Sequence, residues 1–412
     1  MTIDSDRADQ LRAAGEPDWA VRPAYGEYCF AGVPHTVSGI LGADTGPGLP
    51  PATVPNDGRD AEIVLVVLLD GFGLAQWRRD RRAHPFLDRL TDRARVTPLT
   101  SVYPSETAAA LTTFHTGVLP ATHGVIGWNV YEPTVDVAFE ALPFRTKAGT
   151  TPPGLERDDV AAAAPIYPRL RATGIDDRHV VPADITPASD RTHRYEDLAG
   201  FPGQLRAALA AAEPPAYVYA YLPQIDTVAH AAGTGSPAFA SVRSAVLSRI
   251  EAGLAALDPA TASETLLVIT ADHGHVDTDP ARNIDLDACP VVTGALRRHA
   301  DGTPVRFAGS ARNVHLHLEP GSRERVRTAL ERELDALVLS REAVLDQALF
   351  GPDPSPTFRR RLGDVVVTHR DLGVWWGDAE PSTLAHVGMH GGLHPDEMLV
   401  PFAAVGLGDL LG

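Results

Sequence analysis

Three runs of apolar, β-branched or aromatic residues stand out along the chain. They span Glu62–Leu69, Ala216–Leu222 and Thr265–Thr270. Such continuous runs, too short for most helices, are typical of strands that are buried on both faces, as in a parallel sheet. Segments with helical patterning lie between them. The pattern therefore predicts an α/β fold, with a mostly parallel central sheet that is flanked by helices.

An acidic residue follows each of these runs: Asp70, Asp226 and Asp272. The carboxyl ends of parallel strands meet at one edge of a sheet, and ligands of open α/β sheets bind beside that edge. We therefore expect the three carboxylates to lie close together. For Asp70 alone, capping of the next helix is an equally ordinary role.

The remaining apolar and polar patterns predict further elements of both kinds. Expected helices are Pro85–Arg95, Val160–Thr173, Gly203–Ala212 and Ser236–Ala256, and expected strands are Arg95–Thr100, His179–Pro182, Asp364–Thr368 and Leu399–Val405.

Two parts of the chain differ in character from this α/β pattern. Residues 1–58 contain many Gly, Pro and Asp residues and are interpreted as an N-terminal extension that ends in a surface linker. Residues 286–360 combine short strands at Val305–Arg306 and Val314–Leu318 with a charged helix over Ser322–Leu337. We interpret this second part as a smaller inserted α+β cap. The catalytic core then comprises residues 59–285 and 361–412.

The segment Thr100–Asn129 contains a candidate nucleophile. Thr107 lies in the first turn of a predicted helix that Thr116-Gly117 ends. The free backbone N–H groups and positive dipole of a helix N-terminus suit a phosphate or sulfate group. The alternative role of Thr107 is a helix cap without chemistry.

Metal-ligand residue types recur at spacings that allow them to converge. Asp226 and His230 form D-x-x-x-H, which places both on one face if a helix begins there. Asp272 and His273 are adjacent at a strand end, and His390 lies in a glycine-flanked turn. Asp and His are ordinary zinc ligands. With Asp70 and Thr107, these make seven candidate groups.

The order of these motifs resembles the alkaline phosphatase superfamily, in particular its nucleotide pyrophosphatase and type I phosphodiesterase branch. The resemblance covers roughly residues 60–285 and 362–405, and counting back nine positions from Thr116, as in that family, gives Thr107 as the nucleophile. The resemblance implies two Zn²⁺ ions, with other divalent metals such as Mn²⁺ as alternatives. It implies one ion held by Asp226, His230 and His390, and one held by Asp70, Asp272 and His273, with Thr107 beside both.

The resemblance has departures around the nucleophile. Members of the branch often carry T-F-P-N-H there, whereas this chain has V-Y-P-S-E-T-A. Asn129 follows His123-Gly124 at a shifted position and is the candidate for the family's phosphate-contacting asparagine. These differences weaken any assignment of substrate by analogy.

The composition argues against several other classes of protein function. The chain has 412 residues and a net charge of −17, which argues against coating nucleic acids or anionic membranes. An anionic small-molecule substrate remains possible because bound metal ions reverse the local charge. We find no signal peptide and no membrane span, so the expected location is cytoplasmic. The oligomeric state stays open.

The expected function is hydrolysis of phosphodiester or pyrophosphate bonds in nucleotide-type substrates through a covalent Thr107 intermediate. A phosphomonoesterase of the same fold is the alternative, and a non-catalytic binding module on this scaffold is less favoured because all seven positions are filled. A sulfatase is disfavoured because Cys289-Pro290 lacks the C/S-x-P-x-R motif.

Several other polar residues have competing interpretations. Glu106 is either an acid that supports the site or a solvated carboxylate, and His275 is either a support for the metal ligands or a structural residue. His315 and His317, which alternate along a cap strand, are expected to be exposed. Trp375 and Trp376 are expected to serve packing rather than base stacking.

Overall fold

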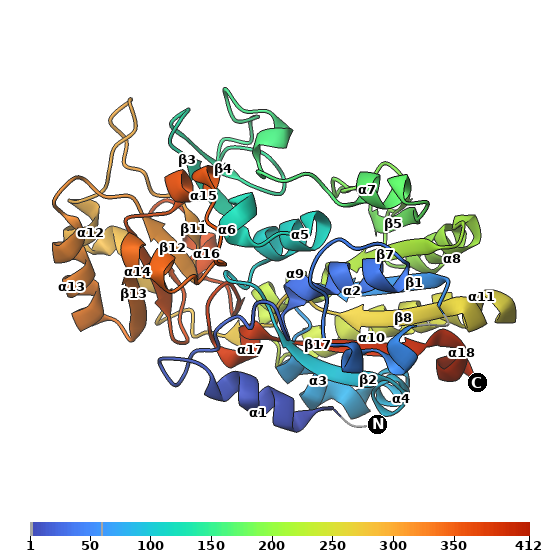
Figure 1. The fold of residues 1–412 in the computed structure, drawn as a ribbon. Helices are drawn as coiled ribbons and strands as arrows, with labels where there is room; N and C mark the ends of the chain where they lie inside the picture. The colour runs from blue at the N-terminus through green and yellow to red at the C-terminus, as the bar shows by residue number, and fades with distance from the viewer. Residues whose placement is uncertain (1–2, 59–60) are drawn as a thin grey trace.

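The structure is a computed structural model that describes residues 3–58 and 61–412. Its centre is a seven-stranded sheet in the order β2-β17-β8-β1-β7-β5-β6, in which every neighbouring pair is parallel except those that β17 makes (Figure 1). The predicted fold class is thereby confirmed. The strands are β1 (Ile63–Leu69), β2 (Arg95–Thr100), β5 (Asp176–Pro182), β6 (Thr192–Tyr195), β7 (Ala216–Leu222), β8 (Thr265–Thr270) and β17 (Leu399–Gly406).

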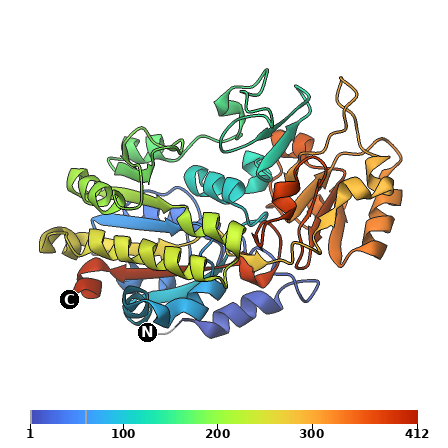
Figure 2. The same cartoon turned by 180° about the vertical axis from the view of Figure 1, so that it is seen from behind.

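Helices cover both faces of this sheet, because successive side chains of a strand point to opposite sides. Alternate residues of β1 enter two different hydrophobic clusters. One face packs against α2 (Val33–Ile40), α5 (Thr107–Thr116) and α7 (Tyr167–Ala172). The other face is seen from behind in Figure 2 and packs against α1 (Ser5–Ala13), α3 (Leu74–Asp80), α4 (Pro85–Arg93), α8 (Phe201–Ala211), α9 (Gln224–Ala232), α10 (Pro237–Leu254), α11 (Pro259–Glu264) and α18 (Leu407–Leu411).

A second, six-stranded antiparallel sheet lies beyond the carboxyl ends of β1, β7 and β8, in the order β13-β14-β12-β11-β3-β4. Residues on one of its faces pack with α12 (Pro290–Thr293) and α13 (Arg323–Glu333). Residues on the other face, with α14 (Arg341–Asp346) and α15 (Pro356–Arg361), join the core of the large sheet. Its strands are β3 (Asn129–Glu132), β4 (Val137–Glu140), β11 (Gly309–Ser310), β12 (Asn313–Leu316), β13 (Ala336–Ser340) and β14 (Val365–His369).

The second sheet draws strands from outside the expected cap range of 286–360. β3 and β4 come from within the expected core, and so does β14, which pairs with both β12 and β13. The local apolar pattern predicts a strand over Asp364–Thr368, close to the observed β14, but it does not reveal the pairing partner of that strand. Because β14 pairs with two strands of the expected cap, the expected core and cap share one sheet.

The N-terminal segment packs on the body, and this includes residues of the expected surface linker. Phe30, Val33 and Val37 are fully buried against the large sheet, and Leu49 and Val54 are buried in the same cluster. The part of the expected linker at residues 59–60 lies outside the described residues. The high Gly and Pro content of this segment reflects its turns, while its few apolar residues supply the anchoring contacts.

Three local predictions also differ from the structure. The helix expected over Val160–Thr173 is limited to α7, because Pro165 disfavours a helical conformation in the residue before it. The helix expected over Ser322–Leu337 ends at Glu333 and is followed by β13. Val305–Arg306 is not a strand.

Four short elements connect the two sheets. They are β9 (Val276–Asp277) paired with β16 (Gly388–Met389), and β10 (Ile284–Asp285) paired with β15 (Val374–Trp375). None of the helices within residues 3–58 and 61–412 combines the length and apolar character that crossing a membrane requires.

Candidate metal centre and nucleophile

Thr107 begins α5, and its side chain lies at the carboxyl edge of the large sheet. Its Oγ1 lies 3.0 Å from Nε2 of His273 and 3.4 Å from Oδ1 of Asp70. The side chain is buried, at 7 % exposure. The first-turn N–H groups of a helix lack intrahelical partners, so α5 offers donors beside this hydroxyl. The structure thus places the expected nucleophile against two of the expected ligands.

Asp70, Asp272 and His273 form one compact group at the ends of β1 and β8. His273 Nε2 lies 3.3 Å from Oδ1 of Asp70 and 3.4 Å from Oδ2 of Asp272. One potential ligand atom from each residue falls within 4.8 Å of the others. The backbone N–H of Gly71 donates to Asp272 Oδ1 over 3.2 Å, which leaves Oδ2 toward the histidine.

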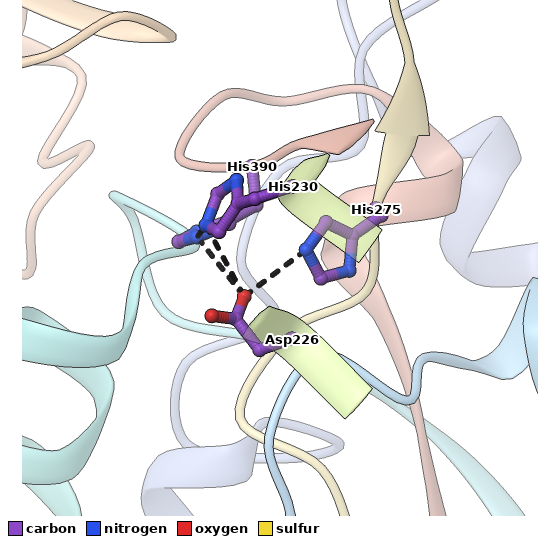
Figure 3. Close-up of side chains that lie close together, drawn as sticks. All are labelled: Asp226, His230, His275 and His390. Atoms are coloured by element: carbon purple, nitrogen blue, oxygen red, sulfur yellow. Dashed lines mark hydrogen bonds and ion pairs between the residues drawn. The ribbon is translucent and has the colours of Figure 1, made fainter. Parts of the chain in front are cut away.

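Asp226, His230, His275 and His390 form a second group, whose ligand atoms also lie within 4.8 Å of one another (Figure 3). Because α9 begins just before Asp226, the four-residue spacing carries His230 onto the same helix face. Asp226 Oδ1 lies 3.4 Å from Nε2 of both His230 and His390, and 3.0 Å from Nε2 of His275. Backbone carbonyls orient the three imidazoles: Gly388 O contacts His230 Nδ1, Ser105 O contacts His390 Nδ1, and Gly71 O contacts His275 Nδ1.

The two groups adjoin each other. The rings of His273 and His390 stack with centroids 3.7 Å apart and planes 9° apart. Burial, followed by the neighbouring Asp272 and Asp226 carboxylates, raises the pKa of Asp70 well above its usual value. Burial also raises the pKa of Asp272. Three buried carboxylates around one point repel one another, and this arrangement favours a bound cation.

The donor set fits divalent metal ions. Asp226 Oδ1 and His275 Nε2 face each other over 3.0 Å, and Asp272 Oδ2 lies 3.4 Å from His273 Nε2, but none of these three buried atoms has a well-formed hydrogen bond among the described residues. Buried polar atoms without partners are costly, and ligation of a metal would satisfy them. Burial lowers the pKa of His230 to about 4 and that of His390 well below its usual value. Both imidazoles are therefore neutral at neutral pH, which is the form that binds metals.

Two supporting residues could not be assigned from the sequence. The Tyr221 hydroxyl donates to Asp70 Oδ2, which turns Oδ1 toward Thr107 and His273. Parallel register sets Tyr221 opposite Leu68, two positions before Asp70. His275, which had two interpretations, contacts Asp226 directly. Tyrosines alternate along β7 at positions 217, 219 and 221, which is a weak sequence signal for one shared face.

A cavity of about 400 Å³ opens beside the nucleophile. Lys147, the sole Lys or Arg residue among those lining it, already pairs with Glu140 over 3.2 Å and Glu380 over 2.7 Å. Asn129 Nδ2 donates to Gly309 O over 3.2 Å and keeps a second N–H. The lining residues are Glu106, Thr107, Trp128, Asn129, Lys147, Asp226, His230, Ser310, Ala311, Trp375, Glu380, Ser382, Thr383, His386, Met389 and His390.

Other singled-out residues have different environments from those expected. Glu106 is 1 % exposed and lines this cavity, so it is not a solvated carboxylate. Burial raises the pKa of Glu106 to about 8. His315 and His317 are buried rather than exposed, because both faces of the second sheet are covered. Trp375 also lines the cavity, whereas Trp376 is packed in the core of the second sheet.

A family of known proteins matches the sequence over most of its length. The sequence model of the type I phosphodiesterase / nucleotide pyrophosphatase family matches residues 64–393. That range contains all seven candidate groups.

Solved structures of low sequence identity share the fold. An inactive form of murine ectonucleotide pyrophosphatase/phosphodiesterase 5 in complex with AMP is 18 % identical, with a TM-score of 0.64 over 84 % of this chain and 88 % of that one. Phosphonoacetate hydrolase from Sinorhizobium meliloti 1021, in complex with phosphonoformate, is also 18 % identical, with a TM-score of 0.60 over 85 % of this chain and 94 % of that one. With a family match over most of its length, the chain belongs to the type I phosphodiesterase / nucleotide pyrophosphatase family of the alkaline phosphatase superfamily and is a phosphoester hydrolase.

Proposed function

We propose that the protein is a two-zinc hydrolase of phosphodiester or pyrophosphate bonds, with Thr107 as its nucleophile. The observation that carries this proposal is the convergence of two groups of metal-ligand side chains on one buried threonine hydroxyl. Asp226, His230 and His390 would hold one ion, and Asp70, Asp272 and His273 the other. Mn²⁺ or a similar divalent ion is the alternative occupant.

Catalysis requires that Thr107 be activated, because a threonine hydroxyl is a poor nucleophile at neutral pH. Divalent ions bound in the two groups would favour the ionised hydroxyl and offset the charge of the phosphoryl group. The contacts of Thr107 Oγ1 with His273 Nε2 over 3.0 Å and with Asp70 Oδ1 over 3.4 Å support this proposal.

In the first step, the Thr107 hydroxyl loses its proton to solvent, its oxygen forms a bond to phosphorus, and the bond from phosphorus to the leaving oxygen breaks. In the second step, a water molecule loses a proton, its oxygen displaces Thr107 from phosphorus, and the threonine oxygen takes up a proton. The N–H groups of the first turn of α5, and the second N–H of Asn129, would donate to non-bridging oxygens of the phosphoryl group.

The cavity favours a monoanionic diester over a dianionic monoester. Recognition of a dianion commonly uses an unpaired arginine or lysine. Of the residues that line the cavity, Lys147 alone is of this type, and two carboxylates already neutralise it. The complex of the murine relative with AMP supports a nucleotide-type substrate.

Metal analysis combined with two chromogenic substrates tests the proposal. We expect about two zinc ions per chain, and faster release of nitrophenol from a nitrophenyl nucleotide diester than from nitrophenyl phosphate. A strong preference for the monoester would instead identify a phosphomonoesterase. Absence of both metal and turnover would leave the binding-module alternative.

A further inference from the structure

Glu106 is a carboxyl group whose environment is unusual for a buried residue. Its side chain is 1 % exposed, and neither carboxyl oxygen has a hydrogen-bond partner among residues 3–58 and 61–412. Leaving a buried carboxyl group without partners is unfavourable, and such groups persist where a ligand or a specific function requires them. Glu106 immediately precedes the nucleophile and lines the same cavity.

A second unpartnered group approaches Glu106 from a different part of the chain. Ser310 ends β11, lines the cavity, and has a buried Oγ without a hydrogen-bond partner in the described structure. A Cβ atom placed on Gly391 would lie 2.8 Å from Ser310 Oγ and 3.8 Å from Glu106 Oε2. The two side chains therefore converge on one point. Burial raises the pKa of Glu106, and the nearby Ser310 hydroxyl and Trp128 backbone only partly oppose this rise.

The chemistry of the two groups narrows the choice of ligand. A phosphoryl oxygen only accepts hydrogen bonds, so it cannot satisfy an oxygen of Glu106 that itself accepts, whichever protonation state the carboxyl group has. An ammonium group only donates hydrogen bonds, so it leaves the O–H of Ser310 without an acceptor, and the proposed metal ions would repel it. A hydroxyl group both donates and accepts, so it can pair with the carboxyl group of Glu106 and with Ser310 without adding charge.

We infer that Glu106 and Ser310 form a subsite for a hydroxyl group on the ester substituent of the substrate. This inference rests on the proposed diesterase function. Because Glu106 is next to the nucleophile, the hydroxyl must lie close to the scissile phosphorus. The substrate class is then a phosphate ester of a polyol, a sugar or a nucleoside.

Three nitrophenyl phosphodiesters that differ in one substituent test this assignment. Their second ester groups are propyl, hydroxypropyl with a terminal hydroxyl, and aminopropyl with a terminal amine. For the metal-loaded wild-type protein we expect kcat/KM to be about tenfold higher for the hydroxypropyl ester than for the propyl ester, as one well-formed buried hydrogen bond provides. The same preference is expected in the Kd values of Thr107→Ala, measured by calorimetry.

Substitution of either subsite residue should remove this preference. Glu106→Ala and Ser310→Ala are each expected to lower the hydroxypropyl-to-propyl ratio to about one or two, and Ser310→Ala alone carries the test if Glu106→Ala does not fold. Glu380→Gln is the matched control, because this cavity carboxylate is already engaged by Lys147 and Trp375. Its ratio should equal that of the wild type.

Three outcomes would overturn the subsite. The first is a hydroxypropyl-to-propyl ratio near one in the wild type, which water alone in the subsite would give. The second is a preference of the wild type for the aminopropyl ester. The third is a tenfold hydroxypropyl-to-propyl ratio that persists in both alanine variants. Failure of the diesterase proposal itself is distinct, since none of the three esters would then release nitrophenol.

Discussion

Tyr221 offers a sharp test of how the protein prepares its metal ligands. Its hydroxyl donates to Asp70 Oδ2, while Asp70 Oδ1 faces Thr107 and His273. Burial and the Asp70 carboxylate raise the pKa of Tyr221 well above its usual value, so the phenol keeps its proton. Tyr221→Phe removes this one donor and changes little of the side-chain volume.

The expected loss of zinc affinity in Tyr221→Phe follows from the hydrogen bond that this substitution removes. A hydrogen bond to an ionised group contributes about 1.5–3 kcal/mol. At about 1.4 kcal/mol per tenfold, this corresponds to a roughly 10- to 100-fold weaker metal affinity, which is also the usual effect of removing a residue that orients a ligand. Competition with a chromophoric chelator would measure the zinc affinity directly.

Tyr219→Phe is the matched control on the same strand. Tyr219 is buried like Tyr221, but its hydroxyl has no hydrogen-bond partner in the described part of the chain. We expect its removal to leave zinc affinity within about threefold of the wild type. Equal affinities for Tyr221→Phe and Tyr219→Phe would refute the claim that the hydroxyl of Tyr221 positions Asp70.

Three further predictions concern catalysis, the buried ion pair between Arg312 and Glu397, and the pH dependence of stability. Thr107→Ala should abolish turnover yet retain bound metal by elemental analysis, and full activity would exclude Thr107 as the nucleophile. Arg312→Met should lower the urea-derived unfolding free energy by roughly 3–5 kcal/mol, because it strands the fully buried Glu397 carboxylate, whose Oε1 accepts from Arg312 over 2.6 Å; a loss below about 1 kcal/mol would contradict this. Burial lowers the pKa of both His115 and His123 to about 3, so below pH 6.5 the unfolded chain binds protons that the folded chain does not. The unfolding free energy should therefore keep the full contribution of each histidine above about pH 6.5 and fall by about 1.4 kcal/mol per pH unit for each histidine below it. His123→Gln should reduce this slope, and an unchanged slope would show that His123 does not cause it.

The positions of the metal-ligand candidates were largely predictable from the sequence. Asp70 and Asp272 follow apolar runs directly, and parallel strands bring such ends to one edge. The Asp226–His230 spacing fixes a shared helix face. Each of these groups is positioned by its own strand end or helix, whereas His390 and the division of the residues into two metal sets depended on the family resemblance.

Contacts that depend on packing between distant segments were not predictable. The environment of Glu106 is set by Ser310 and Gly391, which lie more than two hundred positions away. The burial of Leu49 and Val54 was not predicted, because these isolated apolar residues lie among the Gly and Pro residues of the expected surface linker. The apolar pattern of a strand predicts which of its faces are buried, whereas the strand with which it pairs depends on the rest of the chain.

Anomalous diffraction at the zinc edge, from crystals of the metal-loaded protein, tests the central claim most directly. We predict two peaks a few ångström apart beside Thr107, one among Asp226, His230 and His390 and the other among Asp70, Asp272 and His273. A single peak, or peaks away from these side chains, would contradict the two-metal account.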